Sequence, residues 1–467
     1  MPQVAGSVKE LIAALDGVVR IDGDKLVVVD ENALRTRGAY DLAWTATFSD
    51  DEATREAAQW IVWEASQAVG ARSASIEELY RARSRGEYEG MTVPAINLRA
   101  QTFDMARIIL ETAKKNDSAA VIFELARSEQ TYTFQRVFEY ATSVLAGAIA
   151  AGWKGPVFIQ GDHYQFNAKK YAADAEKMTE EIRKACRDAI AAGYRNIDID
   201  SSTLVDLAFE SLDEQQHQNY LRAAELTALI RSLEVDGVTV SVGGEIGEVG
   251  KVNSTPAELK AYLDGYNAEL AKRAAGAKDL SKVSVQTGTS HGGTPLADGS
   301  VAEVALDFNV LTELSAVARE YGLGGAVQHG ASTLPDDMFH KFPATGCAEI
   351  HLATGFQNAL YNHPAFPAAL HKEIEQWCFD NAADERKAGQ TDVQFVYTAR
   401  KKAIGPFKRQ LWDLATKDEI LASQAAKIDF LFKQLGTPGS RALVEKYVKP
   451  VEFHKAMPEA LKAAVAK

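Results

Sequence analysis

The chain has 467 residues, of which 46% are hydrophobic and 25% charged, and its formal net charge is −13. This composition is typical of a globular protein with a large core, and the acidic balance excludes a broad basic groove for nucleic acid. Three cysteines without a CxxC pair indicate reduced thiols, and the sequence predicts neither a signal peptide nor a membrane helix. We therefore expect a cytoplasmic protein with no nucleic-acid partner and no membrane partner.

Residues 1–72 are expected to form a small N-terminal appendage. Residues 25–32 contain a short β-branched run, which predicts a strand, and residues 51–70 have the apolar spacing of an amphipathic helix. We expect the apolar stripe of this helix to pack against the rest of the chain or against a second subunit.

From residue 73 to residue 406, short β-branched runs alternate with amphipathic segments. Eight strands joined by helices predict an α/β fold with a parallel sheet and right-handed crossovers. Because eight strands also close a barrel, we expect a (β/α)8 TIM barrel, with a doubly wound sheet as the alternative. The predicted strands are residues 92–97, 119–124, 156–161, 196–200, 239–245, 283–288, 325–330 and 349–353. The clearest predicted helices are residues 103–116, 175–193, 255–276 and 308–322.

Residues 407–467 are expected to form a helical C-terminal extension. Two helical stretches are separated by a break that contains proline and glycine. We expect this extension to contribute to contacts between subunits, in a homo-oligomer.

Histidine and acidic side chains follow several of the predicted strands. His163 ends the third strand, Glu245 ends the fifth, and His291 and His329 follow the sixth and seventh. In a barrel the carboxyl ends of the strands form one mouth, so these side chains are expected to meet there. Three imidazoles with an open fourth position are typical of a catalytic Zn²⁺ site, with Co²⁺ or Mn²⁺ as alternatives. Glu245 is either a fourth ligand or a ligand at a second metal position.

Further acidic residues stand beside this expected metal site. Asp162 directly precedes His163, and it is either the catalytic acid and base or a group that orients the histidine. Asp198 and Asp200 are two positions apart on one strand and so share a face. We expect one of them to reach the mouth, unless both belong to a hydrogen-bond network within the barrel.

Small residues beside the later histidines predict a phosphate site. Ser290 and Gly292 flank His291, and Gly330 and Ser332 follow His329. Glycine allows the backbone to approach an anion closely, and serine adds a hydroxyl donor. Barrels often hold phosphate in the loops after their last strands.

Together these segments resemble the class II, metal-dependent ketose-bisphosphate aldolases, a TIM-barrel family that includes fructose- and tagatose-1,6-bisphosphate aldolases. The family's Asp-His pair resembles Asp162-His163, and its Glu-Leu-Gly segment is similar to residues 245–247. Its Gly-Thr-Ala-His-Gly motif resembles residues 288–292, and its His-Gly-Gly-Ser motif resembles residues 329–332. The likeness extends over about residues 75–406 with the order of the motifs preserved.

The resemblance implies a lyase that reversibly cleaves a ketose 1,6-bisphosphate into dihydroxyacetone phosphate and an aldehyde phosphate through a metal-stabilised enediolate. It implies that the three histidines and Glu245 form the metal site. It also implies that Asp162 moves the proton on the hydroxyl of the carbon beyond the cleaved bond. Fructose 1,6-bisphosphate, an intermediate of glycolysis, is the default substrate. The residues expected to contact the phosphorylated ketose are Asn97, Ser290, Gly292, Gly330, Ser332 and Thr354.

The chain departs from the family after the eighth strand, where the family has Lys-Ile-Asn and this chain has Glu349-Ile350-His351. Glu349 is expected to make this wall less favourable to phosphate, and His351 is expected to change the substrate wall. Ala353 favours tagatose bisphosphate or another phosphorylated ketose as the alternative substrate. Two further hypotheses are a non-catalytic aldolase-like subunit and a barrel enzyme of another chemistry, such as an isomerase.

Overall fold

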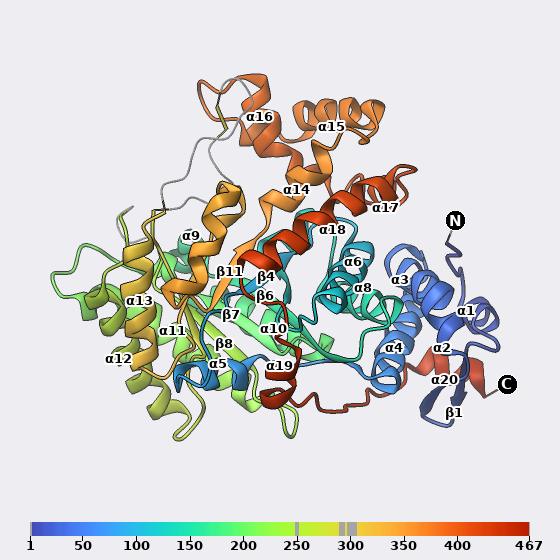
Figure 1. Cartoon of the computed structure of the whole chain (residues 1–467), viewed down its shortest axis with the longest axis horizontal. Helices are drawn as coiled ribbons and strands as arrows, with labels where there is room; N and C mark the ends of the chain where they lie inside the picture. The colour runs from blue at the N-terminus through green and yellow to red at the C-terminus, as the bar shows by residue number, and fades with distance from the viewer. Residues whose placement is uncertain (1, 248–251, 289–294, 297–305, 467) are drawn as a thin grey trace.

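A closed barrel of eight parallel strands forms the centre of the molecule (Figure 1). The computed structural model describes residues 2–247, 252–288, 295–296 and 306–466. Each barrel strand is hydrogen-bonded to the next one in sequence, and β11 closes the ring by pairing with β4. The strands are β4 (Val93–Asn97), β5 (Ile122–Ala126), β6 (Gly155–Gln165), β7 (Asn196–Asp200), β8 (Ser241–Glu245), β9 (Lys282–Val285), β10 (Ala326–Gln328) and β11 (Glu349–Leu352). The closed ring confirms the predicted TIM barrel, and the doubly wound alternative is wrong.

The barrel strands are buried on both faces, as expected for a parallel sheet surrounded by helices. Every residue of β4, β5 and β7 is buried. Several of the buried residues are nevertheless charged, because alternate positions of each strand point into the barrel, where acidic and basic side chains meet. The barrel therefore has an outer apolar layer, which packs on the helices, and a polar interior.

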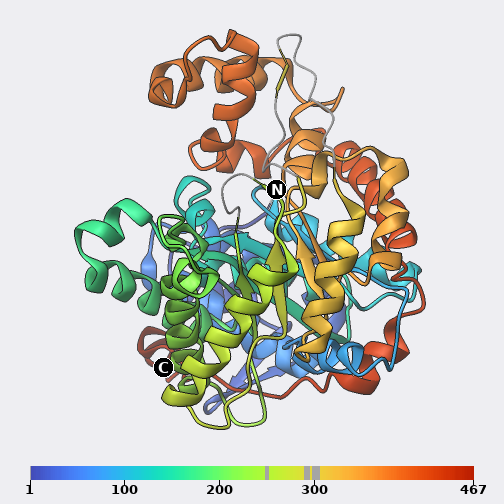
Figure 2. The same cartoon turned by 90° about the vertical axis from the view of Figure 1, so that its left-hand side faces the viewer.

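Helices surround the barrel on all sides (Figure 2). Helix α10 begins at its N-cap Asp174, whose side chain accepts from the backbone of Lys177, and it ends before Gly193, which has a left-handed φ of 111°. Helix α12 begins with a capping box between Thr255 and Glu258. These helices are α6 (Thr102–Lys115), α8 (Val137–Ala150), α10 (Ala175–Ala192), α11 (Leu212–Ser232), α12 (Pro256–Arg273) and α13 (Phe308–Glu320).

Shorter elements connect these strands and helices. They are α5 (Glu77–Ser84), α7 (Arg127–Tyr132), α9 (Ala168–Ala173), η2 (Ser202–Leu204), η4 (Ala331–Thr333) and η5 (Asp336–Thr345). Helix α5 precedes the first barrel strand, and the 3-10 helix η5 stands where the helix after β10 is expected.

The N-terminal segment packs beside α8, to the right of the barrel in Figure 1. Its short hairpin, β1 with β2, lies near α4, and β3 continues the sheet outside the barrel by pairing in parallel with the start of β6. Its elements are α1 (Val8–Ala14), β1 (Val19–Asp22), β2 (Lys25–Val28), α2 (Glu31–Ala33), η1 (Leu34–Gly38), α3 (Ala39–Phe48), α4 (Glu52–Val69) and β3 (Ala71–Ser73). Its apolar residues belong to the same hydrophobic cluster as those of the barrel.

After the last barrel strand the chain forms a helical cap, at the top of Figures 1 and 2. The cap has an apolar cluster of its own, which includes Phe366, Ile374 and Phe395. Its elements are α14 (Thr354–Tyr361), α15 (Ala368–Asn381), η6 (Ala383–Glu385), α16 (Asp392–Ala399), η7 (Arg400–Ala403) and α17 (Lys408–Trp412).

Beyond the cap, the chain returns along the barrel to the N-terminal segment. Helix α18 (Lys417–Gln434) packs on α6, and α19 (Arg441–Tyr447) and α20 (Glu459–Val465) follow. The indole N–H groups of Trp60 and Trp63 donate to the carbonyl groups of Lys455 and Phe453, at 2.9 and 2.7 Å. The first and last helices, α1 and α20, contact each other and lie on the same side of the molecule (Figure 1). The predicted boundaries at residues 72 and 406 stay a prediction.

Within the described residues, no helix combines the length and the apolar character needed to cross a membrane.

Candidate active site

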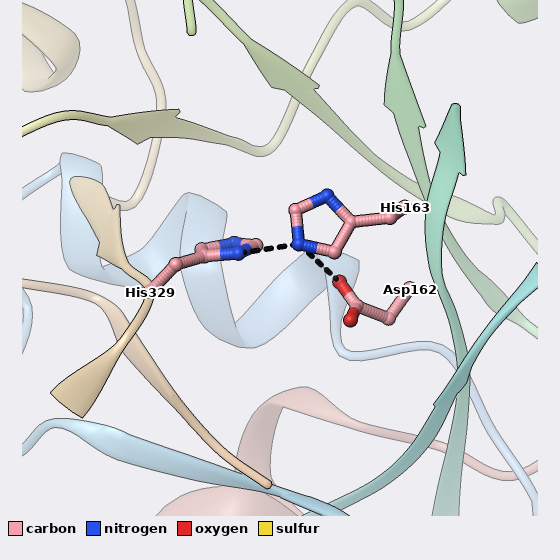
Figure 3. Close-up of side chains that lie close together, drawn as sticks. All are labelled: Asp162, His163 and His329. Atoms are coloured by element: carbon pink, nitrogen blue, oxygen red, sulfur yellow. Dashed lines mark hydrogen bonds and ion pairs between the residues drawn. The ribbon is translucent and has the colours of Figure 1, made fainter. Parts of the chain in front are cut away.

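A β-bulge near the end of β6 brings two adjacent polar side chains to the barrel mouth. Gly161 is opposite Ile197 on β7 and Tyr164 is opposite Ile199, so β6 has one extra residue between these pairs. His163 within the bulge has a φ of +43°, in the left-handed region that residues other than glycine seldom adopt. In a regular strand, Asp162 and His163 would point to opposite faces. With the bulge, both side chains point toward the same cluster (Figure 3).

His329, which directly follows β10, completes this cluster from across the barrel. Its Nδ1 lies 2.7 Å from Nε2 of His163, and the same Nε2 lies 3.7 Å from Oδ1 of Asp162 (Figure 3). The three potential metal-ligand atoms, one from each residue, are all within 4.8 Å of one another. Two imidazole nitrogens are ligands that Zn²⁺ prefers, and a carboxylate lies beside them, so the residues present fit the expected cation.

Two carboxylates contact the other nitrogen of His163. Its Nδ1 lies 3.1 Å from Oδ2 of Asp200 and 3.2 Å from Oε2 of Glu245. Asp200 is in turn held by the hydroxyl of Ser202, which donates at 2.6 Å. An acceptor at one ring nitrogen fixes the tautomer and directs the other nitrogen toward a metal. Asp200 and Glu245 are therefore placed to orient His163, and the assignment of Glu245 as a metal ligand stays a prediction.

The titration behaviour of these groups reflects their burial and crowding. Burial and the Asp200 carboxylate raise the pKa of Glu245 to about 7. Burial lowers the pKa of His163, but Asp162 and Glu245 outweigh it and hold this pKa well above 6.5. Burial also raises the pKa of Asp200, but the hydrogen bond with His163 keeps it below its usual value. A proton and a metal ion would thus compete for the same imidazole.

A cavity of about 240 Å³ opens beside the cluster. Several residues predicted to bind substrate line it together with Asp162, His163 and His329: these are Asn97, Gly330, Ser332 and Thr354. Gly330 has a φ of +69° and precedes the 3-10 helix η4. Ala353 lines the cavity as well, whereas Glu245 does not. The predicted residues Ser290, His291 and Gly292 lie outside the described residues.

Two basic side chains that were not predicted line the same cavity. Arg99, which follows β4, pairs with Glu129 at 2.7 Å and donates to Gln357 at 2.9 Å. Lys401, from η7 of the cap, has no carboxylate within 4 Å among the described residues, and burial lowers its pKa. In the sequence, Lys401 is one of three consecutive basic residues, and nothing there indicates that this segment folds back over the mouth.

A second charged layer lies inside the barrel beneath the cluster. Glu349 is fully buried and accepts from Lys282 at 2.6 Å and from Gln160 at 2.8 Å. It does not line the cavity, which corrects the expectation that Glu349 makes the phosphate wall less favourable. Lys282 also lies 3.0 Å from Asp198, so this aspartate belongs to the internal network and Asp200 is the one that reaches the mouth.

Residues 78–409 match the family model described as fructose-bisphosphate aldolase class-II. The chain belongs to this family. Asp162, His163 and His329 of the cluster lie in segments that resemble motifs of the family. Lys282, Glu349 and His351 instead form a charged network inside the barrel that the family resemblance did not predict. No curated protein matches the chain by sequence.

Solved structures that align with this chain carry different names. One is a probable tagatose 6 phosphate kinase from Sinorhizobium meliloti 1021, with 20% identity, a TM-score of 0.54 and coverage of 80% of this chain and 97% of that one. Another is a fructuronate-tagaturonate epimerase from Cohnella laeviribosi, with 11% identity, a TM-score of 0.53 and coverage of 75% and 82%. A fructose-bisphosphate aldolase from Campylobacter jejuni has 17% identity, a TM-score of 0.47 and coverage of 79% and 97%. At these identities, the first two structures support the barrel fold alone.

Proposed function

We propose that this class II aldolase family member is a Zn²⁺-dependent lyase. It reversibly cleaves a ketose 1,6-bisphosphate, by default fructose 1,6-bisphosphate, into dihydroxyacetone phosphate and an aldehyde phosphate. The observation that carries the proposal is the approach of Asp162, His163 and His329 at the wall of one cavity. This pairs imidazole ligands with a carboxylate that can move a proton.

In this proposal the cation is held by His163, His329 and His291, with Glu245 as a further metal-site residue. When bound, the cation supplies Lewis-acid polarisation of the substrate carbonyl. Asp162, which is 5% exposed and beside the cation ligands, takes the proton from the hydroxyl on the carbon beyond the cleaved bond. The electron pair of that bond stays with the carbonyl-bearing fragment. The reverse reaction returns the proton through the same carboxylate.

The remaining cavity residues would bind the two ends of the substrate. Gly330 and Ser332, with Ser290 and Gly292, are proposed to bind the phosphate nearest the carbonyl. Lys401 and Arg99 support binding of a second anionic group, because a half-buried ammonium that has no carboxylate partner among the described residues favours an anionic ligand. Asn97 is held by Glu129 at 2.5 Å and can present its amide oxygen to a substrate hydroxyl.

A direct assay tests this proposal. Purified protein is analysed for bound metal, and cleavage of fructose 1,6-bisphosphate is followed before chelation, after chelation and after Zn²⁺ is returned. We expect activity to fall with the metal content and to recover with Zn²⁺. Bound metal without cleavage of any phosphorylated ketose would instead support the non-catalytic subunit. A panel of ketose phosphates, compared by kcat/KM, separates fructose from tagatose bisphosphate, which Ala353 at the cavity wall favours as the alternative.

A further inference from the structure

We propose that His351 is a positioning residue that holds Asp162 and His329 in their working arrangement. The inference rests on the proposed function, because it assigns His351 a role at the same site. His351 lies on β11, lines the cavity and is 5% exposed. It touches both the proposed proton-transfer group and a proposed metal ligand.

Carboxylates contact both ring nitrogens of His351, and a second imidazole stacks on one face of its ring. Its Nε2 lies 2.7 Å from Oε1 of Glu349, and its Nδ1 lies 3.2 Å from Oδ1 of Asp162. Nδ1 is also 2.9 Å from Oε2 of Glu124. The ring stacks on His329, with the ring centroids 4.1 Å apart and the planes inclined by 20°. One rigid group therefore contacts residues on β5, on β6 and directly after β10.

Glu349, which contacts Nε2 of His351, is itself held by three hydrogen bonds. Glu349 accepts from the hydroxyl of Tyr80, from Lys282 at 2.6 Å and from Gln160 at 2.8 Å. Tyr80 comes from α5, and the other two come from β9 and β6. Because all of these partners are buried, Glu349 cannot turn away from His351 without leaving its own buried carboxylate unpaired, which is costly inside a protein. Glu349 thus fixes the orientation of the His351 ring, and the ring in turn restricts the position of the Asp162 carboxylate.

The side chain required for this role is specific. An asparagine, which the resembled family has at this position, lacks a ring that could stack on His329. It is also too short to contact Glu349 and Asp162 at the same time. The pair Glu349 and His351 replaces the family's lysine and asparagine together, and Lys282 supplies the positive charge opposite Glu349. His351 and Glu349 therefore act as one unit in this chain.

Two variants separate the contacts made by the ring nitrogens of His351 from the stacking of its ring on His329. His351→Phe keeps a ring over His329 but loses both nitrogens, whereas His351→Asn loses the ring. We expect His351→Phe to keep the Co²⁺ absorption spectrum and metal stoichiometry of the wild type, while kcat for ketose bisphosphate cleavage falls about 10–100-fold and KM changes little. His351→Asn should in addition weaken Co²⁺ binding and change the spectrum. His371→Phe, at a half-buried position on α15 that does not line the cavity, is the matched control and should change neither the Co²⁺ spectrum nor kcat.

The outcomes distinguish this inference from the proposed function. If the wild type binds metal and cleaves ketose bisphosphates, but His351→Phe keeps kcat within about twofold per bound metal, the positioning role is wrong and the lyase assignment stands. If the Co²⁺ spectrum of His351→Asn equals that of the wild type, the contact with His329 has no positioning effect. If the wild type neither binds metal nor cleaves any ketose phosphate, both proposals are wrong. Loss of folding in a variant is detected by circular dichroism, and His351→Gln, which retains one donor, then provides the kcat comparison.

Discussion

Nε2 of His163 lies 2.7 Å from Nδ1 of His329, although the two residues are 166 positions apart in sequence. His163 lies on β6 and His329 directly follows β10, on the opposite side of the barrel mouth, so only ring closure brings them together. Two imidazole nitrogens that face each other at this distance can share a proton or, with both rings neutral, present lone pairs to one cation. The pair is therefore the most direct place to test for a metal.

Replacing His329 by alanine should remove tight metal binding. The variant loses one nitrogen ligand, and we expect Zn²⁺ affinity to fall by at least about 100-fold, because even residues that only orient a ligand contribute roughly 10–100-fold. The measurement is a competition titration against a chromophoric chelator. His371→Ala, on α15 and outside the lining of the cavity, should bind as the wild type does. Unchanged affinity in His329→Ala would exclude this residue as a ligand.

Asp162→Asn should separate metal binding from catalysis. The amide keeps the shape of the side chain but cannot accept a proton, so we expect kcat to fall about 10²–10⁴-fold while the metal content stays near that of the wild type. A coupled assay for dihydroxyacetone phosphate, combined with elemental analysis of the same sample, measures both quantities. A rate close to that of the wild type would remove Asp162 from the mechanism.

Asp200→Asn and Glu245→Gln test whether Glu245 is a ligand or an orienting group. Both carboxylates lie near Nδ1 of His163, so similar losses of about 10–100-fold in metal affinity are expected if both only orient the ring. The same competition titration compares the two variants. If Glu245→Gln loses metal as completely as His329→Ala while Asp200→Asn does not, Glu245 is a ligand.

Lys401→Met should weaken binding of phosphorylated substrates without affecting the metal. Loss of a charge-assisted hydrogen bond typically costs enough to lower kcat/KM about 10–100-fold, mainly through KM. Lys402→Met is a matched control on the same turn, because Lys402 pairs with Glu385 instead of lining the cavity. Equal effects of the two substitutions, measured by initial rates, would show that Lys401 acts only through the overall charge of the cap.

Lys455 predicts a pH dependence of stability that is separate from the active site. Burial lowers its pKa from 10.5 to about 7, and its ammonium lies 3.9 Å from the ring centre of Trp63. Between about pH 7 and 10.5, the unfolded chain therefore binds more protons than the folded one. The burial of Lys455 consequently lowers the free energy of unfolding most below pH 7, and this destabilisation disappears as the pH rises. Lys455→Met should melt higher than the wild type at about pH 6, and the difference should shrink toward about pH 10. A difference in melting temperature that is independent of pH would contradict the assignment.

The barrel was predictable from sequence, whereas the arrangement within its mouth was predictable only in part. Each β-branched run marks a strand because both of its faces are buried, and the number of runs sets the closure. The β-bulge in β6 could not be predicted in this way, since neither its extra residue nor the positive φ of His163 leaves a pattern in the sequence. The bulge nevertheless brings the side chains of Asp162 and His163 to the same side of the strand. Glu349 was misplaced for a related reason, because its partner Lys282 is 67 positions away and is identified only once the strands are arranged in space.

The contacts of Trp60 and Trp63 with the chain near Lys455 make the C-terminal tail part of the N-terminal packing. A chain shortened before Phe453 would leave two indole N–H groups without these acceptors and would uncover apolar surface on α4. Such a truncated protein is expected to aggregate even with a complete barrel. An affinity tag is better placed after α20 than before Phe453, because α20 lies away from the cap (Figure 1).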